Sequence, residues 1–313
     1  MTTSSVFVCP PILFVIFNRP HTAEKVMQTI RRQRPARLYV AADGPRTFPA
    51  DESRACELAR SVAVSVDWPC QVFTLFRREN LGCKRAVASA IDWFFAHEEE
   101  GIILEDDVVA TSSFFQLCSE LLEQYRDDTR VGMISGTNFQ QADASQKPSY
   151  YFSHLYQIWG WATWKRAWKQ YDHSMSQWPD FKSQDGFARL GLSRSFENYY
   201  SPIFDAVAAG KIDSWAYQWM FTGLSTNTFA VMPSVNMVSN IGFGPHATHT
   251  KKKNDWKANM RVADIDFPLC HPLFFNVRHD IDLLTVKRVR SPWYRRVAKR
   301  LVRSVLCNEL QVR

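Results

Sequence analysis

The sequence of 313 residues has little glycine and no cysteine motif. It holds 12 glycines and 15 prolines, and 46% of its residues are hydrophobic, so long disordered regions are not expected. The number of cysteines is odd and none forms a CxxC pair, which argues against a disulfide framework or zinc site and indicates reduced thiols in a cytosol. The seven are Cys9, Cys56, Cys70, Cys83, Cys118, Cys270 and Cys307.

The amino-terminal segment lacks the basic residues of a secretion signal. Its apolar run is broken by Pro10 and Pro11, so we expect neither a signal peptide nor a membrane span there. The length allows one large α/β domain or two modest ones. Because the sequence has no internal repeat, low-complexity tract or clear linker, one domain with a distinct second half is favoured.

The net charge of +7 is concentrated near the carboxyl terminus. Residues 287–313 hold nine basic residues and one acid, Glu309, so the rest of the chain is nearly neutral. A nucleic-acid-binding protein more often spreads basic residues over its folded surface. The charge therefore gives no support for nucleic acid as a partner.

The first hundred residues alternate short apolar runs with amphipathic stretches. This pattern predicts strands at 12–17, 38–42, 71–76 and 101–104, with helices from residue 20 to about 32 and from about 84 to 96. A helix at 111–125 and a strand at 131–135 are expected next. Repeated βα units predict a Rossmann-like α/β fold with a mostly parallel central sheet and helices on both faces.

Each strand predicted in the first hundred residues is followed by polar residues. Asn18 and Arg19 follow the first strand, Asp43 follows the second, and the stretch 77–80, ending in Asn80, follows the third. Parallel strands end at one edge of the sheet, where open α/β sheets bind their ligands. Turns favour such residues in any case, but the convergence of all four ends indicates a site.

The fourth strand ends in three consecutive acids, Glu105, Asp106 and Asp107. Crowded carboxylates repel one another unless a cation is present, and Mn²⁺ or Mg²⁺ prefers oxygen ligands that it commonly shares with substrate phosphates. The triplet therefore predicts a site for one of these metals and a diphosphate. The alternative is a solvated loop after a strand.

These features belong to an ordered set of motifs. They are FNRP at 17–20, AADG at 41–44, ILEDDVVATSSFF at 103–115, WGWATW at 159–164 and DSWAYQW at 213–219. In this order they resemble nucleotide-sugar glycosyltransferases of the GT-A fold. The similarity is to the N-acetylglucosaminyltransferase I type and to related bacterial sugar transferases often labelled hemolysin-like. The acidic triplet, followed by a helix with paired phenylalanines, is the most specific part.

The resemblance implies a donor nucleotide that lies across the strand ends. Arg19 would contact the nucleotide, Asp43 would recognise the base or ribose, and Asp107 would bind the metal that bridges the two phosphates. Asp106 would serve the ribose or a metal-bound water. The remaining donor-binding residues expected are Asn80, Arg85 and, in the floor of the site, Glu105. The metal would neutralise the leaving nucleoside diphosphate.

Displacement of the diphosphate needs a carboxylate that takes the proton of the acceptor hydroxyl. We assign this role to Asp213, and the alternative is that it caps the helix that SWAYQWM should begin. If Asp213 is the base, the resemblance implies inversion of the anomeric centre by direct displacement. Further candidates are Asp172, Asp180 and Asp205.

Two other groups of residues are candidates for ligand binding. His249, or alternatively His246, could complete the metal shell, and the lysines at 251–253 could hold the diphosphate; a solvated loop is the alternative for both. Seven of the eleven tryptophans lie between residues 159 and 219. Tryptophans belong mostly to the core, so we expect one or two at most to stack on sugars.

The expected boundaries place a GT-A domain at 1–284, with a nucleotide-binding half at 1–135 and an acceptor half at 136–284. A C-terminal basic amphipathic helical tail is expected at 285–313, where residues such as Trp293 and Leu301 recur at helical spacing. Such a helix is typical of a membrane-surface anchor, although it could instead pack on the body. An anchor on an anionic membrane surface would make the protein cytoplasmic and peripheral on the inner face of the membrane, and would favour a glycan or lipid-linked glycan acceptor.

Two other functions fit parts of the sequence. A sugar-nucleotide nucleotidyltransferase has a related architecture, but it should carry a Gly-rich phosphate loop after the first strand, where this chain has FNRPHTAEK. A non-catalytic membrane-surface binding protein would use the tail alone. That function leaves the ordered acids unexplained.

Overall fold

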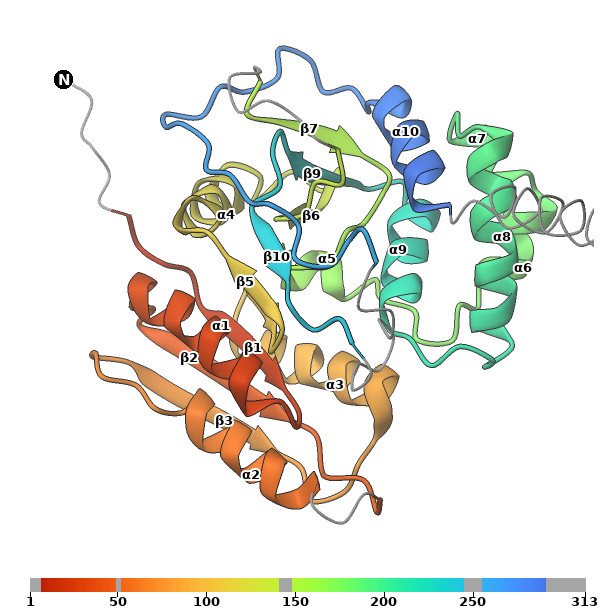
Figure 1. The fold of residues 1–313 in the computed structure, drawn as a ribbon. Helices are drawn as coiled ribbons and strands as arrows, with labels where there is room; N and C mark the ends of the chain where they lie inside the picture. The colour runs from red at the N-terminus through yellow and green to blue at the C-terminus, as the bar shows by residue number, and fades with distance from the viewer. Residues whose placement is uncertain (1–6, 49–51, 141–147, 245–254, 291–313) are drawn as a thin grey trace, which may run out of the picture.

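The computed structural model describes residues 7–48, 52–140, 148–244 and 255–290, which form a mixed α/β structure (Figure 1). The strands are β1 (Ile12–Ile16), β2 (Arg37–Ala42), β3 (Gln71–Phe76), β4 (Glu100–Glu105), β5 (Val108–Ala110), β6 (Val131–Ser135), β7 (Tyr150–Ser153), β8 (Trp161–Trp164), β9 (Phe229–Pro233) and β10 (Val238–Asn240). The helices are α1 (Pro20–Gln33), α2 (Glu52–Ala63), α3 (Gly82–His97), α4 (Ser112–Gln124), α5 (Lys165–Trp168), α6 (Trp178–Ser183), α7 (Gly186–Arg189), α8 (Arg194–Ala208), α9 (Ala216–Ser225) and α10 (His279–Val289).

Eight strands form the central sheet, in the order β3-β2-β1-β4-β8-β6-β9-β7. The first four strands in this order are parallel to one another, which confirms the expected parallel βα units. Their bounds agree with the predicted strands to within one residue at each end, and β4 includes Glu100 and Glu105. The predicted helices agree with α1, α3 and α4 to within two residues at each end.

The expectation of a mostly parallel sheet is wrong for the second half. Strand β8 runs antiparallel to both β4 and β6, and β7 runs antiparallel to β9, while β6 and β9 are parallel. A separate two-stranded sheet joins β5 to β10 in antiparallel fashion. The connections after β6 and β8 are long, so the next strand can run in either direction. The regular alternation of strands and helices in the first half therefore does not continue.

Helices pack on both faces of the sheet, as expected, and each face has its own hydrophobic core. Strand β1 shows the alternation: Ile12, Phe14 and Ile16 face α1, α2 and α4, whereas Leu13 faces the core that contains α3, α5, α8 and α9. Six of the seven tryptophans between residues 159 and 219 are buried, and Trp159 is partly buried. The tryptophan-rich segment therefore mainly builds the second core.

The expected tail begins inside a helix. Helix α10 spans the boundary predicted at residue 285, and the amphipathic residues from Trp293 onward lie outside the described residues. In the part of the chain that the structure describes, no helix is long and apolar enough to cross a membrane. The six cysteines in that part are unpaired thiols.

Helix α10 is attached to the end of β7 by a buried carboxylate. Asp282 accepts hydrogen bonds from Ser153 Oγ at 2.5 Å and from the backbone N–H of His154 at 3.0 Å, and burial raises its pKa to about 7.

The neighbouring residue His154 is 3% exposed, and its ring Nδ1 has no partner among the described residues. Burial and the nearby His279 lower the pKa of His154 to about 4.

We expect His154 to make folding sensitive to acid. The unfolded chain takes up a proton on this ring near pH 6.5, whereas the folded chain does so only near pH 4. The contribution of His154 to stability is therefore complete above pH 6.5 and is lost as the pH falls through this window, by up to about 3 kcal/mol. Urea unfolding of the wild type and His154→Leu, compared at pH 7 and pH 5, measures this loss. Parallel pH profiles for the two proteins would contradict the assignment.

Candidate functional site

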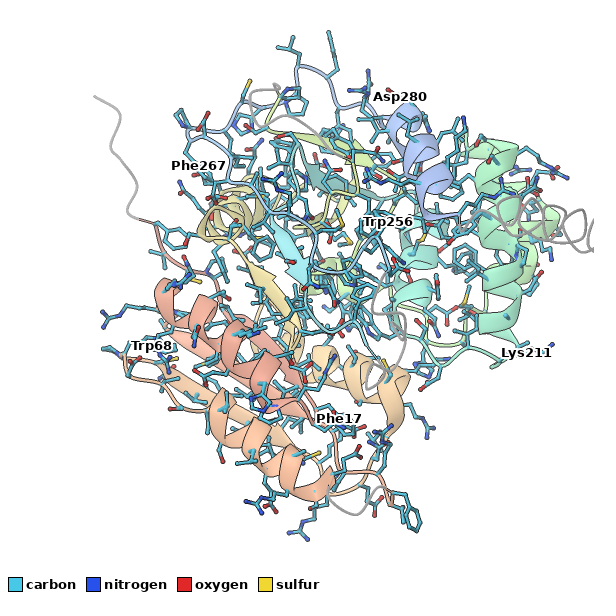
Figure 2. The ribbon with its side chains drawn as sticks, viewed as in Figure 1. Phe17, Trp68, Lys211, Trp256, Phe267 and Asp280 are labelled. Carbon is cyan, nitrogen blue, oxygen red and sulfur yellow. The ribbon has the colours of Figure 1, made fainter. Side chains whose placement is uncertain are left out.

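The polar residues predicted at the strand ends line one cavity of about 310 Å³. The cavity lies at the carboxyl edge of β1, β2 and β4, beside the start of α3. Phe17, the residue after β1, is one of the residues that line it and is labelled in Figure 2. The expected site residues that line it are Arg19, Asp43, Asn80, Glu105, Asp106 and Asp213. The sequence therefore predicted the edge of the sheet at which the cavity lies and most of the charged residues that line it.

Three expected site residues do not line this cavity. Asp107 is buried beside it and contacts Arg19. Arg85 is exposed on the first turn of α3. His249 lies outside the described residues, as do His246 and the lysines at 251–253.

Arg19 joins the two aspartates of the triplet. Its Nη1 donates to Asp107 Oδ2 at 2.7 Å, and its Nη2 donates to Asp106 Oδ1. The other oxygen of Asp106, Oδ2, accepts from the backbone N–H of Phe17 at 2.9 Å. The loop after β1 and the end of β4 are thus held together by one guanidinium and one backbone hydrogen bond.

The pairing of β1 with β4 explains why these groups meet. The two strands are parallel, with Val15 opposite Glu105, so the residues that follow each strand leave the sheet side by side. Burial and the surrounding carboxylates raise the pKa of Glu105, and burial raises the pKa of Asp106 despite the nearby Arg19 charge. The cost of burying these acids makes the guanidinium necessary.

Strand β10 covers the far side of the Arg19–Asp107 pair. The Asn240 Nδ2 group lies 3.5 Å from Asp107 Oδ1, and the backbone N–H of Ile241 donates to the Asp107 carbonyl at 2.8 Å. A Cβ atom at Gly242 would lie 2.0 Å from Asp107 Oδ2 and 2.6 Å from Arg19 Nη1. Only glycine lets the backbone approach this ion pair so closely. The stretch 240–250 was expected to supply a histidine ligand, and both of its histidines lie outside the described residues. Its described part contacts Asp107 through the backbone and Asn240.

The Asp43 carboxylate is hydrogen-bonded to backbone N–H groups of nearby residues. Its carboxylate accepts hydrogen bonds from the N–H groups of Gly44, Leu81 and Gly82, at 3.0 to 3.1 Å. Burial raises the pKa of Asp43, although these three N–H groups oppose the shift. This carboxylate therefore holds the turn that leads into α3, and recognition of a base or ribose by Asp43 stays a prediction. Asn80 supports the same turn, because its Nδ2 donates to the Gly44 carbonyl at 2.7 Å.

Asp213 does not cap the helix that follows it. Helix α9 begins at Ala216, its N-cap residue makes no side-chain cap bond, and Ser214 Oγ accepts from the Ala216 N–H at 3.2 Å. Instead, Asp213 Oδ1 accepts from the backbone N–H of Lys84 in the first turn of α3, at 3.3 Å. The alternative N-cap role predicted for α9 is wrong, and the carboxylate faces the cavity.

The other acidic candidates lie elsewhere. None of the three lines the cavity. Asp172 accepts hydrogen bonds from Ser174 and Ser176, and Asp205 pairs with Lys182 at 2.8 Å. Asp180 is exposed at the start of α6. Their contacts therefore give them local structural roles.

The sequence did not single out Arg46, and it gave Arg77 only as part of the polar stretch 77–80, although both line the cavity. Arg46 forms an ion pair with the buried Glu52, and its guanidinium lies over the Phe17 ring, 5.5 Å from the ring centroid. Arg77 Nη2 donates to Ser89 Oγ at 2.8 Å. The position of Arg46 just after the AADG motif was the available signal, but its partner is on helix α2, which the sequence pattern did not reveal.

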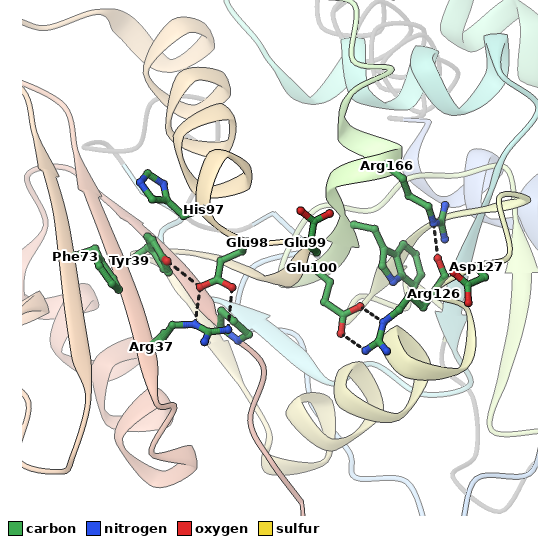
Figure 3. Close-up of a pocket in the computed structure, with 12 residues that line it drawn as sticks. Arg37, Tyr39, Phe73, His97, Glu98, Glu99, Glu100, Arg126, Asp127 and Arg166 are labelled. Atoms are coloured by element: carbon green, nitrogen blue, oxygen red, sulfur yellow. Dashed lines mark hydrogen bonds and ion pairs between the residues drawn. The ribbon is translucent and has the colours of Figure 1, made fainter.

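A larger groove of about 830 Å³ lies at the opposite edge of the sheet (Figure 3). Most of its charged side chains are already paired. Arg37 forms an ion pair with Glu98 at 2.6 Å, Tyr39 also donates to Glu98, and Arg126 pairs with Glu100 at 2.9 Å. The groove is open, and its ion pairs join neighbouring elements. The smaller cavity is therefore the candidate functional site.

In the ranges that the structure describes, no group of three or more histidine, cysteine, aspartate and glutamate side chains is arranged to hold a metal ion. The chemistry of the donors does suit a hard cation, because Asp106 and Asp107 are oxygen ligands that already share one positive group, the Arg19 guanidinium. A metal bound here would take one or two protein carboxylates and further oxygens from a ligand.

Comparison with known proteins adds little. No protein-family model matches the chain, and no curated protein matches it. Among solved structures, HddC from Yersinia pseudotuberculosis is similar over 50% of this chain and 77% of its own, with 11% sequence identity and a TM-score of 0.32. The same protein complexed with GMP-PN gives a TM-score of 0.33 over the same shares. A similarity this weak carries no argument about the ligand or the reaction.

We expect Asp43→Ala to destabilise the fold markedly. The substitution leaves three backbone N–H groups at the start of α3 without their acceptor, which costs about 2–4 kcal/mol of unfolding free energy. Urea unfolding measures the loss. The exposed Asp67, which pairs only with Arg31, provides the control: Asp67→Ala should cost no more than about 1 kcal/mol. Equal effects of the two substitutions would show that Asp43 does not hold this turn.

Proposed function

We propose that this protein is a metal-dependent glycosyltransferase of the GT-A fold. It would move a sugar from a nucleoside-diphosphate sugar to a hydroxyl of a glycan or lipid-linked glycan. The observation that supports this most is the meeting of Arg19, two acids of the triplet and Asp213 in one cavity, although Asp213 is more than a hundred residues away in sequence. The acids supply the oxygen ligands that a hard cation prefers, and the Asp213 carboxylate, which lines the cavity, would take a proton.

The donor diphosphate would lie between Arg19 and the acidic triplet. A divalent metal bound there would neutralise the leaving diphosphate, with Asp107 as its main ligand and Asp106 beside it. Arg19 binds oxygens of the same two aspartates. It would therefore contribute a further positive charge next to the diphosphate. Glu105 forms the floor. Burial raises its pKa, so a proton on Glu105 would reduce the negative charge that a diphosphate meets.

Asp213 would act as the general base. The acceptor oxygen attacks the anomeric carbon while the bond from that carbon to the diphosphate oxygen breaks, and the hydroxyl proton moves to the Asp213 carboxylate. The backbone N–H of Lys84 holds Oδ1 of this carboxylate, which leaves Oδ2 to accept the proton. Direct displacement of this kind inverts the anomeric centre.

Residues 291–313 remain part of the proposal. The basic and apolar pattern of that segment supports a cytoplasmic protein attached to the inner face of an anionic membrane, where lipid-linked acceptors are found. Flotation of the full chain with vesicles that contain 30% anionic lipid, at low and high salt, tests this attachment.

The reaction can be tested with purified full-length protein, Mn²⁺ and a panel of sugar nucleotides. A glycosyltransferase releases a nucleoside diphosphate from one donor, and the release stops when EDTA removes the metal. A nucleotidyltransferase would instead consume a sugar phosphate and liberate pyrophosphate. A non-catalytic binding protein would release neither product, and that result would overturn the proposal.

Two substitutions separate the proposed roles of the acids. Asp107→Asn should lower turnover at least about 100-fold and weaken its metal dependence, because the main metal ligand is lost. Asp213→Asn should lower kcat by about 10²–10⁴-fold and leave donor binding, measured by calorimetry, within about twofold. Asp180→Asn is the control, because that residue is exposed on α6 outside the cavity. Wild-type turnover in either site variant would contradict the corresponding role.

A further inference from the structure

The Arg19 guanidinium lies where a cation would join Asp106 and Asp107. One of its nitrogens binds each carboxylate. The side chains of the two acids are 2% and 9% exposed, whereas the Arg19 side chain is 26% exposed. The guanidinium therefore occupies one oxygen of each carboxylate.

We propose that Arg19 and a divalent cation compete for this carboxylate pair, and that the displaced guanidinium then binds the diphosphate. The identity of the diphosphate ligand rests on the proposed function, but the competition for the carboxylates does not. A divalent ion cannot approach Asp107 Oδ2 while Arg19 Nη1 is 2.7 Å from the same oxygen, because the two positive groups repel each other and need the same lone pairs.

The Arg19 backbone and the Asp106 carboxylate are each held by hydrogen bonds. The Arg19 carbonyl accepts hydrogen bonds from Ala23 N at 3.0 Å and from Thr22 Oγ1 at 3.2 Å, which fix its backbone at the start of α1. Asp106 is fixed through Oδ2 by the backbone of Phe17. The tip of Arg19 therefore changes partners while the carboxylates stay in place, and it remains in the cavity that it lines.

This arrangement couples the two ligands. A metal alone must displace Arg19 without giving the guanidinium a new partner, so it should bind weakly. A diphosphate supplies that partner and also donates oxygens to the metal, so each ligand should increase the affinity for the other by the same factor. Arg19 would thus neutralise the acidic triplet before the donor binds. The triplet would become a metal site only when the metal and the donor diphosphate bind together.

Titration of the full chain with Mn²⁺ alone, followed by the electron paramagnetic resonance signal of the free ion, tests the competition. Arg19→Met should bind Mn²⁺ at least tenfold more tightly than the wild type, and Arg19→Gln should also gain affinity. Arg19→Lys keeps a positive charge and should stay close to the wild type. Arg46→Met is the matched control, because Arg46 lines the same cavity but pairs with Glu52, and its Mn²⁺ affinity should change less than twofold.

The location of the gained site and the folding of the variants need their own measurements. Arg19→Met combined with Asp107→Asn should lose the gain in Mn²⁺ affinity. Arg19→Met should also melt at a lower temperature than the wild type and show a larger rise in Tm when Mn²⁺ is added, because the ion replaces the missing positive group. Mn²⁺ binding to Arg19→Met that is no tighter than to the wild type, or a gain that persists in the double variant, would overturn the proposal. Failure of every sugar nucleotide to release a diphosphate would overturn the transferase function and leave these titrations unaffected.

Discussion

The burial of acidic side chains at the end of β4 is the constraint on which the site depends. Asp106 and Asp107 are almost fully enclosed, and carboxylates in such surroundings need a positive partner. Arg19 can be that partner because β1 and β4 are parallel neighbours, so both chains leave the sheet at the same edge. The pairing of two strands thus determines where a cation must lie, and Gly242 lets the second sheet close over it.

The sequence predicted the first half of the fold because the signals there are local. Strands β1 to β4 are continuous apolar runs separated by amphipathic helices, and the order of the chain nearly determines a parallel sheet. Beyond β6 the strands have three to five residues, and their partners are far away in sequence. Strands this short have no periodicity to read. The tryptophans of this region indicate that the segment is buried, but they do not indicate which strands pair.

The candidate site could likewise be predicted only in part from the sequence. The rule that ligands bind at the carboxyl ends of parallel strands was enough to bring Arg19, Asp106 and Asn80 together. The partners of individual groups could not be predicted, because they depend on loop conformation. Gly82 has a φ of +77°, and the turn that it allows directs the N–H groups of α3 at Asp43. A side chain that seemed free for a ligand is therefore satisfied by the backbone.

The start of α3 connects the two halves of the chain. Asp43 comes from the end of β2 and Asp213 from the segment before α9, and both accept hydrogen bonds from N–H groups in or next to the first turn of this helix. These N–H groups have no partners within the helix, and the positive end of the helix dipole favours negative charge there. One carboxylate fixes the helix to the sheet and the other fixes the second half to the helix. Asp213 is consequently held against the half of the chain that carries the acidic triplet. In the proposed reaction, this contact would set the distance between the general base and the acids that bind the metal.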